Sequence, residues 1–314
     1  LNIYDYPSNK RKIHKQPILI SGGLLIIISL LIYFIYLFIN ELNDPSLKNN
    51  IILFIYPIIF FFLGIYDDKF DLNPNTKLIL TTIIYSSVVL VDSNLQVTNL
   101  RLSFTTKVIQ LESFSIFFSI FCFVVFLNAL NMFDGINGQS AIYSIILLSL
   151  LFYRDNDANI ILLIIICLIF YLYYNLKNKM FLGDSGITIL SYIIAVNFIS
   201  QYNEGIILDA DLIFLYFSVP GFELIRLTFF RIIIGKHPFS ADNNHLHHYL
   251  NKIFSPLKTL ILIIGIYLLP IILNIFGLSL VYCILTSLIL YSISITVSYK
   301  KLSNNKNDLL KNKK

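Results

Sequence analysis

The sequence predicts an all-α, polytopic membrane protein with about ten transmembrane helices, whose functional loops lie on the cytoplasmic face. Of its 314 residues, 57% are hydrophobic and 13% are charged, whereas soluble domains are about 45–50% apolar and about 25% charged. Apolar runs near the length of about 20 residues that crosses a bilayer recur along the whole chain. We therefore expect one integral membrane domain over residues 1–314.

Ten apolar segments support this prediction, and the fifth of them is short for a transmembrane helix. In chain order the predicted spans are 17–39, 50–66, 77–93, 113–130, 139–153, 158–175, 186–201, 209–230, 257–276 and 279–298.

The positive charges are distributed unevenly between the loops that these spans define. With the N-terminus in the cytoplasm, 19 of the 23 Lys and Arg residues fall on the cytoplasmic side. The four on the opposite side are Lys48, Arg101, Lys107 and Arg154. Because Lys and Arg are enriched in cytoplasmic loops, we expect both ends of this chain to lie in the cytoplasm.

The segments outside the spans give weaker indications. Residues 1–16 are polar and basic, so they form a cytoplasmic loop and not a signal peptide. Residues 94–112 alternate polar and apolar side chains, which fits a small hairpin, an amphipathic piece or a plain connector. Residues 300–314 predict a disordered, basic cytoplasmic tail beside the membrane. The three cysteines lie in apolar runs, as buried hydrophobic residues do.

Four polar loops fall on the same predicted face, and the first is GIYDDKFDLNPNTK. Asp67 and Asp68 follow an apolar span directly, so they lie near the negative end of its helix dipole. Two carboxylates are unfavourable there unless a cation binds. The pair therefore indicates a divalent-metal site or a catalytic base, and a solvated loop is the alternative.

The second loop is NALNMFDGINGQS. Asn128, Asn131, Asp134 and Asn137 recur every three residues, so on a helix they share one face. The neighbouring glycines favour a helix break that lets backbone N–H groups approach a ligand. Helix capping explains one such residue but not four in register, so this ladder indicates a binding site.

The third and fourth loops are FLGDSG and GKHPFSADNNHLHHYL. Asp184 lies between two glycines before a span, where it fits either a helix N-cap or a contact to a metal or phosphate. His245, His247 and His248 fit either a zinc site or, with Lys236, a patch that binds phosphate. The lack of a nearby Cys or Glu favours the phosphate interpretation.

The motifs GIYDDKFDLN, NALNMFDGINGQ, FLGDSG and SADNNHLHH resemble, in this order, the polyprenyl-phosphate N-acetylhexosamine-1-phosphate transferases (MraY/WecA type). The opening stretch resembles that family's first cytoplasmic loop through Asp5, Pro7, Arg11, Lys12, His14, Pro17, Gly22 and Gly23. The resemblance covers nearly the whole chain. The family carries one more span before this loop, which implies either a truncated start of the present chain or a gene model that begins late.

The resemblance implies roles for the first group of site residues. Asp184 would coordinate Mg²⁺, with Mn²⁺ as an alternative, together with the pyrophosphate of a UDP-sugar, and Asn131 would assist it. Asp67 and Asp68 would orient or deprotonate the lipid phosphate, so both count with Asp184 as catalytic. Lys77 stands where related enzymes carry a phosphate-binding lysine.

The remaining motif residues are implied to bind the soluble substrate. Asn128, Asp134 and Asn137 would line the nucleotide pocket. His245, His247 and His248 would hold the phosphates or position the sugar nucleotide. All four loops would then form one Mg²⁺ pocket at the inner leaflet, where a UDP-sugar and a membrane-bound polyprenyl phosphate can meet.

Three departures from the family's patterns distinguish this chain, and the last of them bears on the substrate. Many bacterial members read DGID where this chain reads DGIN, so Asn137 excludes a carboxylate at that position. Glu223 stands where relatives often carry Asp, and it is spaced to pair with Arg226. The ending HLHHYL lacks the Glu that follows the histidines of peptidoglycan translocases.

The resemblance therefore implies an undecaprenyl-phosphate GlcNAc-1-phosphate transferase in a bacterial inner membrane, which releases UMP in the first membrane step of a cell-wall or lipopolysaccharide glycan pathway. It allows a homodimer and implies no nucleic acid partner. The alternatives are a UDP-MurNAc-pentapeptide translocase, a transporter or flippase, a zinc-dependent membrane hydrolase and an inactive relative.

Overall fold

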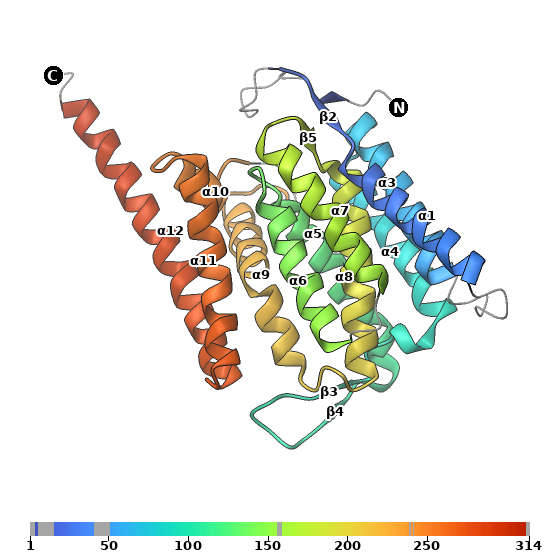
Figure 1. Ribbon diagram of the computed structural model, residues 1–314. Helices are drawn as coiled ribbons and strands as arrows, with labels where there is room; N and C mark the ends of the chain where they lie inside the picture. Colours follow the sequence, from blue (N-terminus) through green and yellow to red (C-terminus); the bar gives the residue numbers. More distant parts are fainter. Residues whose placement is uncertain are drawn as a thin grey trace. The chain divides into compact units, whose positions relative to one another are not determined.

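The computed structural model describes residues 4–5, 16–40, 51–155, 159–238, 240 and 242–311 (Figure 1). Within these ranges the helices are α1 (Gly22–Asn40), α3 (Tyr56–Phe70), α4 (Pro74–Val91), α5 (Ser115–Phe133), α6 (Gln139–Arg154), α7 (Asn159–Leu176), α8 (Gly183–Asn203), α9 (Ala210–Ile233), α10 (Leu246–Asn251), α11 (Pro256–Ile275) and α12 (Leu280–Lys311). A π-helical turn, η1 (Ile51–Ile55), precedes α3.

Each of the ten predicted spans coincides with one long helix, so the prediction of an all-α polytopic membrane protein is confirmed. In the described part of the chain, nine helices are long and apolar enough to cross a membrane. The tenth, α6, is apolar but has only 16 residues. Large apolar side chains such as Phe38, Leu90 and Ile275 are well exposed on α1, α4 and α11, as lipid contact requires.

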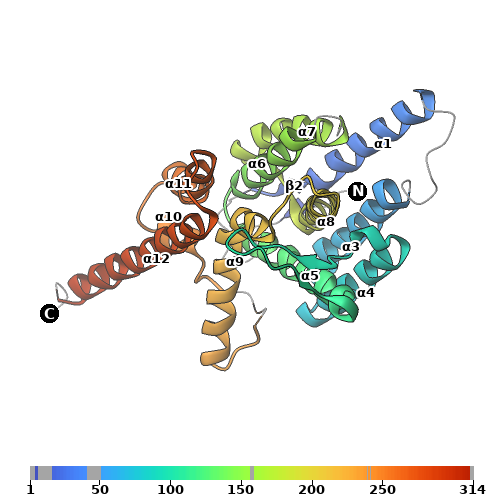
Figure 2. The same ribbon diagram turned by 90° about the horizontal axis from the view of Figure 1, so that it is seen from below.

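The chain divides into two compact units. The first comprises residues 1–131 and 140–210, and the second comprises residues 132–139 and 211–314. In the first unit α8 is buried along most of its length and packs against α3 and α1 (Figure 2). Its contact with α3 is close, because a Cβ on Gly64 would lie 2.3 Å from the Cα of Ser185.

Short strands tie the N-terminal segment to the start of α8. Strand β2 (Ile18–Ile20) pairs in parallel with β5 (Met180–Phe181), and β1 (Tyr4–Asp5) pairs with β2 in the antiparallel sense. At the end of the unit where α4 leads into α5, β3 (Asn99–Leu100) pairs with β4 (Ile109–Gln110) between the 3₁₀ turns η2 (Ser93–Leu95) and η3 (Glu112–Phe114). The hairpin interpretation of residues 94–112 is therefore confirmed.

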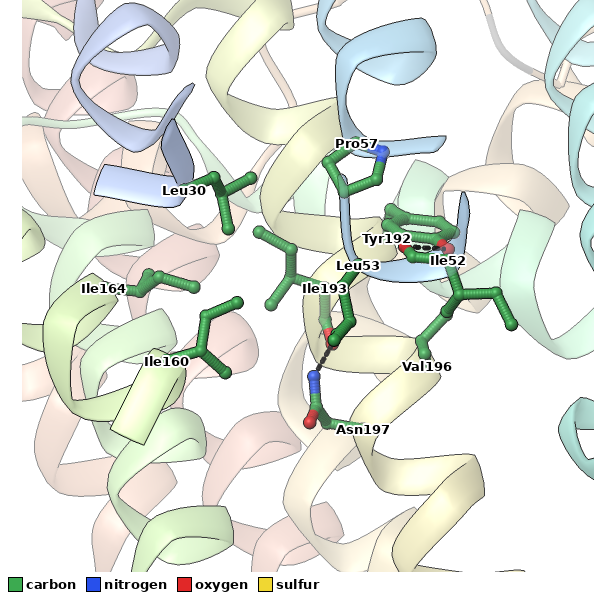
Figure 3. Close-up of a pocket in the computed structure, with 10 residues that line it drawn as sticks. All are labelled: Leu30, Ile52, Leu53, Pro57, Ile160, Ile164, Tyr192, Ile193, Val196 and Asn197. Carbon is green, nitrogen blue, oxygen red and sulfur yellow. Dashed lines mark hydrogen bonds between the residues drawn. The ribbon is translucent and has the colours of Figure 1, made fainter. Parts of the chain in front are cut away.

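A small apolar cavity lies among α1, η1, α7 and α8 (Figure 3). The Tyr192 hydroxyl donates to the Ile52 carbonyl at 2.9 Å, and the Asn197 amide donates to the Ile193 carbonyl at 2.7 Å. The polar groups at its wall are thus paired. The lining residues are Leu30, Ile52, Leu53, Pro57, Ile160, Ile164, Tyr192, Ile193, Val196 and Asn197.

In the second unit α11 and α12 pack together, and the short α10 packs on both. The Ser218 hydroxyl of α9 lies 2.8 Å from the Ser287 hydroxyl of α12. The prediction that residues 300–314 are disordered is wrong as far as Lys311, because α12 continues to that residue. The tail contains no Pro or Gly, and its Lys and Leu residues are good helix formers, so nothing in it stops the helix.

Candidate active site

Three aspartates and one lysine form a polar cluster in the first unit, where the end of α3 meets the starts of α4 and α8. We call it the acidic cluster, and its members are Asp67, Asp68, Lys77 and Asp184. Asp67 and Asp68 lie in the last turn of α3, and Asp184 lies in the first turn of α8. A short turn connects α3 to α4, whose first turn Asn73 caps by accepting the Asn75 N–H at 3.1 Å. This turn reverses the direction of the chain, so that Lys77 in the first turn of α4 faces the end of α3 and the start of α8.

The ammonium group of Lys77 bridges two carboxylates. Its Nζ lies 2.6 Å from Asp67 Oδ2 and also forms an ion pair with Asp184 Oδ1. The other oxygen of Asp67 accepts the Leu72 N–H at 2.9 Å, so both oxygens of this buried side chain are in use. The Asp184 side chain is 31% exposed. Asp184 is therefore the carboxylate of this pair that is most accessible to a ligand.

The Asp68 carboxylate holds the N-terminus of α8. Its two oxygens accept the N–H groups of Asp184 at 2.8 Å and Ser185 at 3.0 Å. These N–H groups lack partners within the helix, and the positive end of the helix dipole favours the carboxylate. Asp184 is thus not the N-cap of α8, since Asp68 satisfies those groups from another helix.

Glycines make this close approach of backbones feasible. Gly183 has φ +71°, and a Cβ there would lie 2.2 Å from Ile20 and 2.8 Å from an Asp68 oxygen. A Cβ on Gly23 would lie 2.8 Å from the Gly186 nitrogen. The glycines of the opening stretch and of FLGDSG therefore pack against one another. Of that stretch, Pro7, Arg11, Lys12 and His14 lie outside the described residues.

The predicted polar ladder is only half helical, so its four side chains do not share one helical face, and the helix break expected near Gly135 and Gly138 is confirmed. Asn128 and Asn131 lie on α5, but this helix ends at Phe133, and Asp134 and Asn137 lie in the following loop. Asp, Asn and Gly favour turns at such positions, and Gly138 has φ +85°. The Asn128 amide donates to the Val124 carbonyl at 2.7 Å. That Asn131 assists Asp184 in binding a metal ion stays a prediction.

The three predicted histidines form a cluster in the second unit. Their ring centroids lie 4.3–5.7 Å apart, and His245 immediately precedes α10, which carries His247 and His248. The DGIN loop packs against this cluster, because a Cβ on Gly135 would lie 1.9 Å from His247 Cε1. Among the described residues no group of three or more His, Cys, Asp or Glu side chains is arranged to hold a metal ion by itself.

The protonation of the histidines follows from their burial. Burial, together with the neighbouring His245, lowers the pKa of His248 to about 4. Burial and the two adjacent imidazoles lower the pKa of His247 well below its usual range. Both rings are therefore neutral at pH 7, and each offers one N–H donor. Lys236, which we expected beside them, is exposed.

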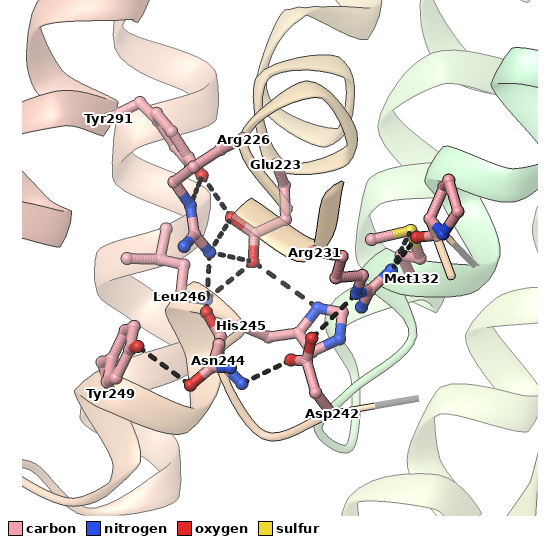
Figure 4. A network of polar contacts seen from close by, with 11 residues as sticks. Met132, Glu223, Arg226, Arg231, Asp242, Asn244, His245, Leu246, Tyr249 and Tyr291 are labelled. Atoms are coloured by element: carbon pink, nitrogen blue, oxygen red, sulfur yellow. Dashed lines mark hydrogen bonds and ion pairs between the residues drawn. The ribbon is translucent and has the colours of Figure 1, made fainter. Parts of the chain in front are cut away.

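Charged residues of α9 anchor the segment that leads to the histidines (Figure 4). The buried Arg231 donates to Asp242 Oδ2 at 2.8 Å and to the Pro238 carbonyl at 2.7 Å. Although burial alone raises it, the hydrogen bond from Arg231 leaves the pKa of Asp242 below its ordinary value. The predicted pairing of Glu223 with Arg226 is confirmed at 3.0 Å.

Arg231, Asp242 and Tyr291 were not selected from the sequence. A signal was available for Arg231, because it lies eight residues after Glu223 in a helix that is otherwise mostly apolar, and charged residues inside membrane helices tend to be functional. Tyr291, one of 20 tyrosines, offered no such signal.

The fold and these two clusters define a polytopic membrane protein with a lysine-bridged acidic cluster at the ends of three helices. Whether the acidic and histidine clusters form one pocket stays a prediction, since each belongs to a different unit.

The sequence model of glycosyl transferase family 4 matches residues 50–201 of this chain. It is 27% identical over 275 residues to the undecaprenyl-phosphate alpha-N-acetylglucosaminyl 1-phosphate transferase of Thermotoga maritima, with 86% of this chain and 80% of that protein covered. It is 26% identical to the probable undecaprenyl-phosphate N-acetylglucosaminyl 1-phosphate transferase of Bacillus subtilis, with 78% of this chain and 68% of that protein covered. It is 24% identical to the undecaprenyl-phosphate alpha-N-acetylglucosaminyl 1-phosphate transferase of Salmonella typhi, with 79% of this chain and 69% of that protein covered. The family resemblance of the motifs is thus confirmed.

Proposed function

We propose that this protein transfers N-acetylglucosamine 1-phosphate from UDP-N-acetylglucosamine to undecaprenyl phosphate and releases UMP. The observation that carries the proposal is the acidic cluster, in which Lys77 joins Asp67 to Asp184 at the first turn of α8. The names of the relatives supply the reaction class, and the four motifs of this chain supply the residues. The peptidoglycan-precursor and transporter alternatives are not favoured by these relatives.

The reaction concentrates negative charge at one phosphorus atom. An oxygen of the lipid phosphate attacks the β-phosphorus of the nucleotide sugar, and the bond from that phosphorus to the bridging oxygen breaks, so UMP leaves with the electron pair. Positioned cations and N–H donors stabilise such a transition state. Lys77 supplies a cation, and Asp67 orients it through the ion pair at 2.6 Å. Asp68 orients Asp184 through the backbone of α8.

Mg²⁺ fits the oxygen donors of this cluster. The ion commonly binds one or two carboxylates together with substrate phosphates, and three carboxylates with one ammonium leave two negative charges uncompensated here. Asp184, the more accessible of the two carboxylates that Lys77 bridges, would hold the ion, with Asn131 as an assisting ligand and with Mn²⁺ as an alternative metal. Bound there, the metal would supply charge neutralisation on the pyrophosphate. Lys77, oriented by Asp67, would remain to hold the acceptor phosphate.

The histidine cluster fits the soluble substrate. His245, His247 and His248 present imidazole groups within 5.7 Å of one another. Neutral imidazoles can donate N–H groups to phosphate oxygens, and a bound anion would raise their affinity for protons. Asn128, Asp134 and Asn137 would line the nucleotide pocket. The protein would lie in the inner membrane of a bacterium with both ends of the chain in the cytoplasm. There the cytoplasm supplies the nucleotide sugar and the membrane supplies the lipid phosphate.

The test of the function uses membranes that contain the protein. They are incubated with undecaprenyl phosphate, Mg²⁺ and a panel of labelled UDP-sugars, and both UMP and the lipid-linked product are measured. We expect product from a UDP-N-acetylhexosamine, and only when the lipid phosphate is present. Absence of turnover with every UDP-N-acetylhexosamine contradicts the proposal. Membranes that carry Asp184→Asn provide the matched control.

A further inference from the structure

A buried carboxylate in α9 collects polar contacts from three other parts of the second unit. Glu223 is 3% exposed, and its oxygens accept hydrogen bonds from Arg226 at 3.0 Å, from the Tyr291 hydroxyl, and from the Leu246 N–H at 2.8 Å. The Nδ1 atom of His245 lies 3.5 Å from Glu223 Oε1 (Figure 4). Glu223 thus joins α9, α12 and the histidine cluster.

These contacts fix the backbone on both sides of His245. Glu223 accepts the N–H of the residue that follows it, Leu246, and Arg226 donates to the carbonyl of the residue that precedes it, Asn244, at 2.7 Å. A carboxylate and a guanidinium from one helix therefore clamp the chain where α10 begins. His245 cannot shift along the membrane helix without breaking one of these two bonds.

The same carboxylate lies beside the Nδ1 atom of the His245 ring, beyond hydrogen-bonding geometry. A carboxylate beside Nδ1 favours the tautomer with a proton on that nitrogen, and the opposite nitrogen, Nε2, is left for a ligand. The 3.5 Å separation is longer than a strong hydrogen bond. Closure of this gap on substrate binding would strengthen the preference.

Tyr291 restrains the carboxylate from the other side. Its hydroxyl donates to Glu223 and accepts from Arg226 Nε at 2.7 Å. A buried ionic group of this kind is a poor source of stability, because its desolvation cost offsets much of its Coulombic attraction, and apolar replacements are often as stable. The arrangement is better explained by the position that it gives to the histidines.

We propose that Glu223 and Tyr291 are positioning residues for the histidine cluster, and that they hold His245 in the orientation that binds the phosphates of the nucleotide sugar. The proposal rests on the proposed function. Neither side chain needs to contact the substrate, since each acts through His245 and the start of α10.

Two serines provide a matched control for Tyr291. Ser287 lies one turn before Tyr291 on α12, and its hydrogen bond to Ser218 joins the same two helices without touching Glu223. Tyr291→Phe and Ser287→Ala therefore both remove buried hydrogen bonding between α9 and α12. A purely structural role predicts similar effects of the two variants, whereas a positioning role predicts an effect on substrate binding by Tyr291→Phe only.

The experiment measures KM and Kd for UDP-N-acetylglucosamine with purified protein, since neither constant depends on how much protein is folded. We expect Tyr291→Phe to raise both about 10-fold and Glu223→Gln to raise both about 10–100-fold, as loss of an orienting partner does elsewhere. Glu223→Asp keeps the charge and should recover most of the affinity. Ser287→Ala should stay within about twofold of the wild type.

The outcomes separate the two proposals. A wild-type protein that turns over no UDP-N-acetylhexosamine contradicts the proposed function itself. An active wild type whose Tyr291→Phe variant binds the sugar nucleotide as Ser287→Ala does overturns the positioning role. So does a Glu223→Asp variant that binds no better than Glu223→Gln. Should Glu223→Gln not fold, the comparison of Tyr291→Phe with Ser287→Ala still decides.

Discussion

Removal of the Lys77 ammonium leaves Asp67 and Asp184 facing each other without a shared counterion. The Nζ atom pairs with both carboxylates, and its side chain is 12% exposed. Two carboxylates about 5 Å apart at an effective dielectric constant of about 20 repel each other by about 3 kcal/mol. Because Asp184 is 31% exposed, solvent screening reduces this figure, and about 2 kcal/mol is a fair expectation.

We therefore predict that Lys77→Met lowers the stability of the first unit in the absence of divalent cations and that Mg²⁺ recovers part of the loss. The expected decrease of the unfolding midpoint is on the order of 5 °C. Mg²⁺ should reduce the difference in unfolding midpoint between Lys77→Met and the wild type, because a cation that binds only the folded state stabilises that state by mass action. The assay is thermal unfolding in one detergent, with chelator or with Mg²⁺.

Lys69→Met is the matched control, since Lys69 lies beside Asp67 and Asp68 in the last turn of α3 but is exposed, with its Nζ 5.1 Å from the centroid of the Phe70 ring. It should change the midpoint little under either condition. If Lys77→Met behaves like Lys69→Met, or if Mg²⁺ leaves its deficit unchanged, then the bridging role of Lys77 and the cation site beside it are both refuted.

Three further predictions concern single groups. Asp184→Asn should lower transfer at least about 100-fold while the thermal midpoint stays near that of the wild type; near-normal turnover would contradict the metal assignment. Gly135→Ala should weaken binding of UDP-N-acetylglucosamine in calorimetry, because its Cβ would overlap His247, whereas the control Gly265→Ala places its Cβ in open space. The pKa of His248 is about 4 in the folded chain against about 6.5 when unfolded, so its contribution to stability is complete above about pH 6.5 and is lost as the pH falls to about 4. The unfolding midpoint of His248→Gln should therefore fall less steeply across this window than that of the wild type, and parallel profiles would argue against a neutral His248.

The helices and the acidic residues could be predicted from the sequence because each depends on local chemistry. Ten apolar runs gave ten helices, since a bilayer demands long apolar segments whose backbone is hydrogen-bonded internally. Asp67 was conspicuous because a carboxylate at the negative end of a helix dipole is costly, and Asp184 was conspicuous because two glycines flank it. The sequence also indicated that a cation must compensate Asp67 and Asp68, and Lys77 fills part of that role.

Other features depended on contacts between distant residues. Asp68 caps α8 across 116 residues of chain, so the role of Asp184 as an N-cap could not be excluded beforehand. Tyr291 reaches Glu223 across 68 residues, and no local pattern distinguishes it from other tyrosines. The period of three in the polar ladder was real in the sequence, but turn chemistry after Phe133 overrode the helical periodicity.

The position of the transferred phosphorus tests the proposed reaction most directly. Purified protein and undecaprenyl phosphate are incubated with UDP-N-acetylglucosamine that carries radioactive phosphorus only in its β-phosphate. We predict that the label moves into the lipid and that the released nucleotide is unlabelled UMP. Label that remains in a released UDP would mean that only the sugar is transferred, and it would contradict the reaction assigned to this site.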